Sequence, residues 1–267
     1  MSIFKQLRIL VLLLILFLVA AGTWLTQWRS TSWEKPLVVA IYPVNGDDST
    51  PSAAYIENLS LDTFDDIETF FMDEAEQFQL GLKQPVDIVL GPVLNEHPPE
   101  PPENRNPLKV MWWSLKIRWW AWQVGRDVGP PANVQIFVLY HDPKASPRLA
   151  HSLGLQKGLL GVVHAFASQR QTGGNNIVIA HELLHTVGAT DKYDPQTNQP
   201  VFPMGYAEPD MEPALPQEFA EIMAGRVPLS HTQFRQARNL GEVMVGEYTA
   251  REIRWIKERV ARKQERY

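Results

Sequence analysis

The 267-residue chain contains no cysteine, and this absence excludes several kinds of site at once. Disulfide bonds cannot form, and a zinc ion cannot be held by thiolates. A cysteine latch that keeps a metal site inactive is excluded as well. The absence leaves the redox compartment undetermined. Any zinc site in this chain must therefore be built from His, Asp and Glu.

An excess of positive charge is also missing. The chain carries 25 Lys and Arg against 30 Asp and Glu, for a net charge of -5. Binding to a polyanion calls for a basic excess, so we predict no nucleic-acid partner. The composition is otherwise globular, with 45% hydrophobic residues and no internal repeat. Its length allows one sizeable domain with a targeting segment, or at most two small domains.

One long apolar run is present, close to the N-terminus. It extends from Ile9 to Leu25, seventeen residues without a charge, and follows Lys5 and Arg8. As a helix it would span about 25 Å, the short end of what crosses a bilayer. The preceding positive charges predict that the N-terminus is cytoplasmic and that the rest of the chain lies on the outer side of the membrane.

Two interpretations of this N-terminal segment stay open. Trp24 and Trp28 suit an interfacial position and favour an uncleaved membrane anchor. The small residues Val19-Ala20-Ala21 would also serve as a signal-peptide cleavage site, in which case the protein is secreted. We therefore assign residues 1–30 to a transmembrane anchor or signal segment, and residues 31–267 to an extracytoplasmic (periplasmic) domain.

The remaining chain alternates strands with helices, which predicts an α/β fold with a mixed twisted sheet packed on a helix. Helical spacing runs over residues 61–80 and again through the stretch that follows Gly174. Two further helices are predicted downstream, so that the part from about 217 to 267 would be mainly helical. Buried strands are predicted at residues 36–44, 85–94, 133–140 and 161–167, the last of them at the sheet edge. The two downstream helices are predicted at residues 229–240 and 247–266.

A tryptophan cluster interrupts this alternation. Its members are Trp112, Trp113, Trp119, Trp120 and Trp122, interleaved with Lys116 and Arg118. The cluster fits an apolar surface that faces a membrane or a substrate, helped by the cations. Two of the tryptophans, 113 and 120, fall two helical turns apart, as expected for a helix packed on a core. We favour core packing.

The most informative stretch begins at His181 and reads HELLHTVGATD. On a helix, His181 and His185 lie one turn apart and point off the same face, where both imidazoles suit Zn²⁺. Glu182 is placed to take a proton from a water that the zinc activates. Gly188 is suited to end the helix with φ > 0 and to turn the chain, so that Asp191 becomes the third ligand and one position stays open.

The context of this short motif favours a packed helix over a chance match. Gly174-Asn175-Asn176 predicts a turn and an N-cap just before it. Its apolar residues predict burial, and buried histidines beside a glutamate need a partner, for which a metal is the simplest choice. Asp194 is a competing third ligand, but the spacing favours Asp191.

The form HExxHxxGxxD resembles the metzincin class of zinc metallopeptidases. The resemblance implies a strand-helix-strand-strand-strand-helix order over roughly residues 36 to 225, zinc bound by His181, His185 and Asp191, and Glu182 as general base. Metzincins usually have histidine as third ligand, and the aspartate matches the smaller snapalysin-like branch. A carboxylate ligand lowers the net charge of the site and makes the zinc a weaker Lewis acid.

The resemblance also implies a methionine turn beneath the zinc, for which there are two candidates. Met223 lies in the apolar segment EIMAG, and Met204 lies in FPMGY, where a tyrosine follows two residues later. We favour Met223 because an Ile-Met pair suits a buried floor, although core packing is the commoner fate of methionine. Tyr193 and Tyr206 are candidates for stabilising an oxyanion.

The function expected from these residues is a zinc-dependent metalloendopeptidase that acts on a peptide or protein substrate at the outer side of a membrane. One alternative is a non-catalytic, zinc-stabilised module that binds a partner at the membrane surface. Another is a hydrolase of non-peptide amides. His164 is a weaker candidate for the cleft, and His141 and His151 are given no role.

Overall fold

The structure is a computed structural model that describes residues 5, 8–14, 17, 31–102, 106–156 and 158–256. Its centre is a five-stranded sheet in the order β2-β1-β3-β5-β4. The first four of these strands run parallel, and β4 pairs antiparallel with β5 at the edge. The strands are β1 (Leu37–Asn45), β2 (Val86–Leu90), β3 (Val134–His141), β4 (Leu153–Leu155) and β5 (Leu160–Phe166).

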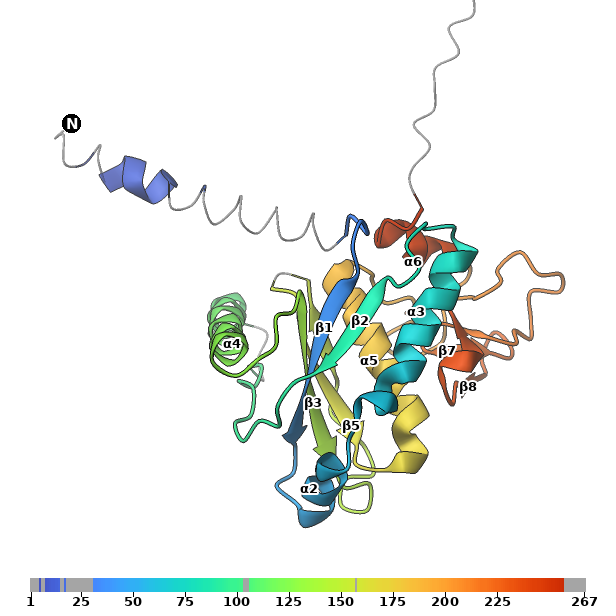
Figure 1. Ribbon diagram of the computed structural model, residues 1–267. Helices are drawn as coiled ribbons and strands as arrows, with labels where there is room; N and C mark the ends of the chain where they lie inside the picture. The colour runs from blue at the N-terminus through green and yellow to red at the C-terminus, as the bar shows by residue number, and fades with distance from the viewer. Residues whose placement is uncertain are drawn as a thin grey trace, which may run out of the picture.

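Helices cover both faces of this sheet, which makes three layers (Figure 1). α3 (Asp65–Gln77) and α5 (Thr172–Val187) lie on one face, and α4 (Pro107–Asp127) lies on the other. Each face has its own cluster of buried apolar side chains, as expected for central parallel strands that are apolar on both sides. The shorter helices are α2 (Thr50–Glu57), η1 (Leu61–Phe64), η2 (Gln169–Gln171), η3 (Leu240–Glu242) and α6 (Glu247–Glu252).

The α/β class and the four predicted strands are confirmed, but the edge of the sheet is not where we expected it. The segment 161–167 was predicted as the edge strand, whereas β5 lies between β3 and the three-residue strand β4. The sequence gives little warning of β4, because Leu153-Gly154-Leu155 is too short to show a period.

The prediction of a mainly helical C-terminal part is wrong for the residues that the structure describes there. In place of a helix over 229–240, two short strands form a hairpin, followed by a 3-10 turn. Only Leu229, Phe234, Ala237 and Leu240 are apolar in that segment, and only Leu240 of these is buried, so little apolar surface is available to hold a helix there. The strands here are β6 (Ala220–Glu221), β7 (Arg226–Pro228), β8 (Phe234–Gln236) and β9 (Val243–Met244).

The last predicted helix, 247–266, is shorter than expected within the described residues. α6 ends at Glu252, and a turn follows in which Trp255 packs among the rings of Trp33, Phe71 and Phe78. The predicted continuation beyond residue 256 lies outside the described residues.

The tryptophan cluster lies on α4 and divides between two faces. Trp113 and Trp120 pack against the sheet, as predicted for core packing, and the Trp120 ring lies 4.6 Å from that of Phe137 on β3. Trp112, Trp119 and Trp122 are exposed on the other side.

The apolar run Ile9–Leu25 falls mostly outside the described residues. Among the residues that are described, no helix is both long and apolar enough to cross a membrane. The anchor therefore stays a prediction from the sequence.

Candidate metal centre

Helix α5 carries the HExxH motif and is the helix that packs most directly on β5 and β4. It ends at Val187, and Gly188 follows with φ of 112°, in the left-handed region, as predicted. Its start was misplaced, because Gly174 to Asn176 are helical and do not precede the helix. The side-chain amide of Asn175 accepts a hydrogen bond from the backbone N–H of Phe166 and donates one to its carbonyl. The side-chain amide of Asn176 donates to the carbonyl of Thr63. These side chains fasten α5 to its neighbours where we expected a cap.

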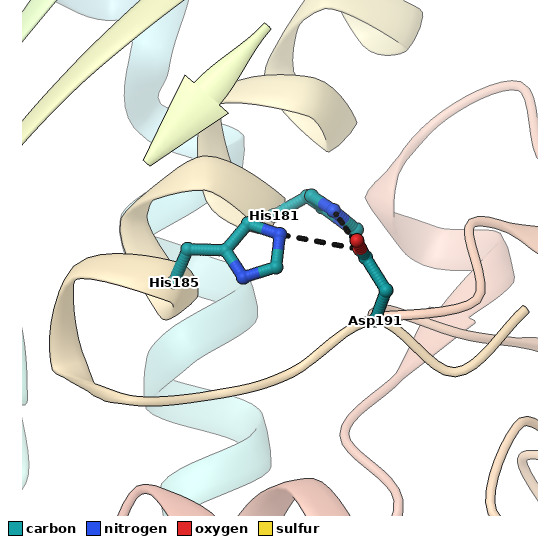
Figure 2. A group of neighbouring side chains, drawn as sticks. All are labelled: His181, His185 and Asp191. Atoms are coloured by element: carbon teal, nitrogen blue, oxygen red, sulfur yellow. Dashed lines mark ion pairs between the residues drawn. The ribbon is translucent and has the colours of Figure 1, made fainter. Parts of the chain in front are cut away.

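Three side chains converge at the C-terminal end of this helix (Figure 2). The Nε2 atoms of His181 and His185 each lie 3.2 Å from Oδ1 of Asp191. The two imidazole rings are nearly perpendicular, with centroids 4.7 Å apart. The turn at Gly188 thus brings a carboxylate to both histidines. This is the group of three among the described residues whose donor atoms could hold one metal ion.

The other nitrogen of each imidazole is already engaged. Nδ1 of His181 lies 2.9 Å from the carbonyl oxygen of Ile222, and Nδ1 of His185 lies 2.8 Å from that of Ala189. A carbonyl oxygen only accepts, so each Nδ1 must carry the hydrogen. The Nε2 lone pairs are therefore free to point at a metal, which is the arrangement that orients histidine ligands in proteins.

The donor set fits zinc in type and in spacing. Two neutral imidazoles and one carboxylate are ordinary zinc ligands, and tetrahedral bonds of about 2.0–2.1 Å separate ligand atoms by about 3.3 Å. Both nitrogen-to-oxygen distances in the group are 3.2 Å. Three protein ligands leave a fourth tetrahedral position for water or substrate, which distinguishes catalytic zinc sites from structural ones.

Glu182 lies beside this group and is not part of it. Its side chain is 6% exposed, and its Oε2 has no hydrogen-bond partner. Burial is the largest influence on the carboxyl and raises the pKa of Glu182 above its ordinary value. A buried carboxylate oxygen without a partner costs free energy. The position is therefore suited to a group that takes up a proton from a molecule held at the metal.

A buried turn after β6 supports His181. Met223 is completely buried in the segment after β6, and the preceding residue supplies the carbonyl that fixes His181. The turn is held by Glu221, whose Oε2 accepts hydrogen bonds from the backbone of Met223 at 2.7 Å and of Ala224 at 3.0 Å. Met204, the other candidate for the methionine turn, is 42% exposed.

A second set of contacts holds the loop that presents Asp191. Lys192 is buried, and its Nζ lies 2.7 Å from Oε2 of Glu252 on α6. The same carboxylate accepts from both the backbone and the hydroxyl of Thr190. Asp194, the competing ligand, has its Oδ1 engaged by the backbone of Gln196 and Thr197. The structure thus brings Asp191 to the histidines and leaves Asp194 capping its own turn.

A cleft of about 380 Å³ opens beside the metal group. Its walls include Glu182, Tyr193, His151 and His164. His164 Nδ1 lies 3.0 Å from His141 Nε2, and burial, with that neighbour, lowers the pKa of His164 to about 4. An uncharged His164 is thus a polar wall of the cleft at neutral pH.

The two tyrosine candidates are separated by the fold. Tyr193 lines the cleft, whereas Tyr206 is buried and packs edge-to-face on Phe202. Beside Tyr193, the guanidinium of Arg226 lies 5.5 Å from that ring and 5.2 Å from the ring of Phe234. Within the described residues no carboxylate pairs with this arginine, so the cleft contains a cation available to a ligand.

Three supporting residues were missed in the sequence: Glu221, Arg226 and Glu252. Glu252 acts on Lys192 across 60 positions and Arg226 lies against the ring of Tyr193, whereas Glu221 acts both on the turn beside it and on the hydroxyl of Thr249, 28 positions away. Their local sequence carries no period or spacing that marks them. The one available signal was the glutamate directly before Ile222-Met223, a charge within an otherwise apolar segment.

Comparison with known proteins adds no assignment. No protein-family model matches the chain, and no curated protein matches its sequence. The arguments about this site therefore rest on its own geometry.

Proposed function

We propose that the protein is a zinc-dependent metallopeptidase, with zinc held by His181, His185 and Asp191. The observation that carries the proposal is the buried, unpartnered Oε2 of Glu182 beside three converging metal donors. A site that only stabilised the fold would gain nothing from such a carboxylate, and its burial would cost free energy. In a hydrolytic site the Glu182 carboxylate would serve as the general base.

When bound, zinc polarises the scissile carbonyl and lowers the pKa of water to about 7. Glu182 accepts the proton of the attacking water and passes it to the leaving amine. Tyr193, on the wall of the cleft, is placed to donate to the oxygen that becomes negative. Arg226 offers its charge to a carboxylate of the substrate, so peptides with an acidic residue near the cleaved bond are the first to test.

The membrane anchor belongs to this proposal as a second element. The apolar run Ile9–Leu25 would hold the domain at the outer surface of a membrane, with substrate reaching the cleft from the aqueous side. A non-catalytic zinc module is the competing function, and it predicts metal binding with no hydrolysis of any substrate.

The deciding experiment combines zinc analysis with hydrolysis assays on the full chain in detergent. Wild-type protein, Glu182→Gln and His185→Ala are compared for bound zinc and for cleavage of a quenched fluorescent peptide library that includes acidic sequences. We expect about one zinc per wild-type chain. Glu182→Gln should retain the zinc and lose roughly 10²- to 10⁴-fold in rate, and His185→Ala should lose both.

Two results would count against the proposal. Wild-type protein without zinc after metal is added back would remove its basis. Glu182→Gln with undiminished hydrolysis would show that the buried carboxylate is not the base. Cleavage of non-peptide amides alone would retain the chemistry and replace the substrate class.

A further inference from the structure

Helix α4 is apolar on two faces, and the sheet covers only one of them. On the inner face, Ile117 and Ala121 are buried against the strands, with Trp113 and Trp120 packed beside them. This inner face accounts for the position of the helix in the fold. A surface helix of a globular protein ordinarily has polar residues on its opposite side.

The opposite side of α4 is instead a stripe of large apolar residues, here called the outer face. Its members recur at spacings of three, four and seven, so they share one side of the helix. Trp119 and Trp122 also contact each other, with ring centroids 5.0 Å apart. The outer face consists of Leu108 (70% exposed), Met111 (57%), Trp112 (70%), Leu115 (52%), Trp119 (61%) and Trp122 (49%).

Figure 1 shows α4 at the periphery of the molecule, on the opposite side of the sheet from α3 and α5, and the outer-face side chains are exposed to solvent. Exposed apolar surface of this size marks an interaction site. Something outside the described residues must therefore cover it.

The charges on α4 indicate what that is. The helix contains Lys109, Lys116, Arg118 and Arg126, and its one acidic residue, Asp127, pairs with Arg126 at the last turn. The chain as a whole has a net charge of -5, so this helix is a local exception. Tryptophans with interleaved lysines on an apolar face are typical of helices that lie in the interface of an anionic bilayer.

The course of the chain places such a bilayer within reach. Trp33 is fixed to the domain by a hydrogen bond of 2.7 Å to the carbonyl of Ile253. From Leu25, the end of the predicted anchor, eight residues lead to Trp33, which span at most about 28 Å. α4 leads into β3, whose first residue pairs with Val39 of β1, the strand entered from that same segment. The predicted anchor would thus hold the domain within this distance of the membrane.

We propose that the outer face of α4 lies on the surface of an anionic lipid bilayer, with its tryptophans inserted at the level of the headgroups. The phosphate groups of the lipids then contact Lys109 and Lys116, which are exposed at its margins. A shallow groove lies between α4 and the loop before it, and Glu100 is the acidic residue among the described residues that line it, beside Lys109 and Lys116. α5, which supplies two of the three metal donors, lies across the sheet from α4 (Figure 1), so this orientation would leave the cleft beside the metal group facing water.

The chain lacks cysteine, which makes a direct test available. Single cysteines introduced as Leu115→Cys or Trp119→Cys accept a fluorescent label on the outer face. Gln196→Cys labels an exposed loop in the region of the metal group as the matched control. The full chain is reconstituted in vesicles of phosphatidylcholine with phosphatidylglycerol, and quenching is measured with nitroxide lipids and with aqueous iodide.

We expect nitroxide lipids to quench the labels at 115 and 119 and iodide to quench the label at 196. In vesicles with phosphatidylglycerol, the variant Lys109→Gln/Lys116→Gln should lower the ratio of docked to undocked helix by roughly 25-fold, about fivefold for each lysine. The Lys→Gln changes are on the surface and leave the fold intact, which circular dichroism checks.

Equal quenching by nitroxide lipids at 115, 119 and 196 would overturn the proposal. So would protection of 115 and 119 from iodide without quenching by the lipids, because that result would assign the face to a protein partner or to a second copy of the chain. Neither outcome depends on zinc or on hydrolysis, so the test is independent of the proposed function.

Discussion

At the scale of single residues, the hydrogen bonds of the metal centre orient its side chains and leave selected nitrogen and oxygen atoms available to a metal or a water molecule. Each histidine uses Nδ1 on a backbone carbonyl and keeps Nε2 for a metal. Glu182 keeps one oxygen without a partner. Burial is essential to this arrangement. In water each of these atoms would be hydrated, and no surrounding structure would hold it in a fixed orientation toward a metal or substrate.

Glu74, away from the centre, predicts the pH dependence of stability. Burial, together with the charges of Asp73 and Glu221, raises its pKa to about 7, although the backbone of Val245 donates to it. The raised pKa means that the folded protein binds the proton more tightly than the unfolded chain does. This contribution is complete below the unfolded pKa of about 4.5 and is lost as the pH rises through about 7.

In the wild type, the titration of Glu74 should lower the free energy of unfolding by on the order of 3 kcal/mol between pH 5 and pH 8. We expect Glu74→Gln to lack this decrease, because glutamine does not titrate. Urea unfolding of wild type and Glu74→Gln at both pH values measures it. Parallel stability curves for the two proteins would show that Glu74 does not titrate in this range.

At the scale of elements, the site depends on how α5 fits between its neighbours. The edge strand β4 crosses α5 at Gly154, where a Cβ atom would lie 2.4 Å from the carbonyl oxygen of Glu182 and 2.6 Å from Cβ of His185. Only glycine permits this approach. Gly154 therefore sets how closely the edge strand approaches Glu182 and His185.

Gly154→Ala is therefore expected to displace α5 and to destabilise the protein by about 1–3 kcal/mol, with weaker zinc binding. Gly174→Ala in the same helix is the matched control, since its Cβ meets no atom closer than 3.9 Å. That change should stabilise the protein by about 0.5–1 kcal/mol. Chemical unfolding and zinc titration test both, and equal effects of the two variants would contradict the account.

The link between α6 and the loop of Asp191 gives a second prediction at this scale. Glu252→Ala leaves the buried ammonium of Lys192 without its carboxylate, which should cost about 2–3 kcal/mol because Glu252 is itself partly exposed. Zinc affinity should fall with it. Glu247→Ala, on the same helix, breaks only an exposed pair with Arg251 and should change stability by about 0.5 kcal/mol or less. Unchanged zinc affinity in Glu252→Ala would show that the loop holds its shape alone.

At the scale of the whole molecule, the metal group joins two parts of the chain. Two ligands come from α5, and the third comes from the loop that leads to the C-terminal strands and α6. A metal at this point would couple the layered α/β part to the C-terminal segment that contains β6 to β9 and α6. Zinc binding is then a term in global stability.

Zinc at 100 times its Kd should stabilise the protein by about 2.7 kcal/mol and raise its Tm by roughly 5–10 °C. A chelator should reverse the shift, and Asp191→Ala should not respond to zinc. Calorimetry of the full chain in detergent, with and without chelator, measures the effect. A zinc response that persists in Asp191→Ala would place the metal elsewhere.

The sequence alone was sufficient wherever the determining residues lie a few positions apart. The spacing of His181 and His185, the left-handed glycine at 188 and the apolar strands of the sheet all follow from local geometry, and the structure agrees with each. The prediction of a helix over 229–240 was wrong because the structure of that segment depends on distant residues. Leu240, its one fully buried apolar residue, packs into the main apolar cluster with residues from distant segments, and a local period does not express such contacts.

Only the tertiary structure decided the rest, because those interactions close long loops. The carbonyl that fixes His181 comes from a residue 41 positions away, and the carboxylate that pairs with Lys192 from one 60 positions away. The tryptophans of α4 show the same limit. Their spacing indicated a helix, but which of them face the sheet and which face outward depends on where the strands lie.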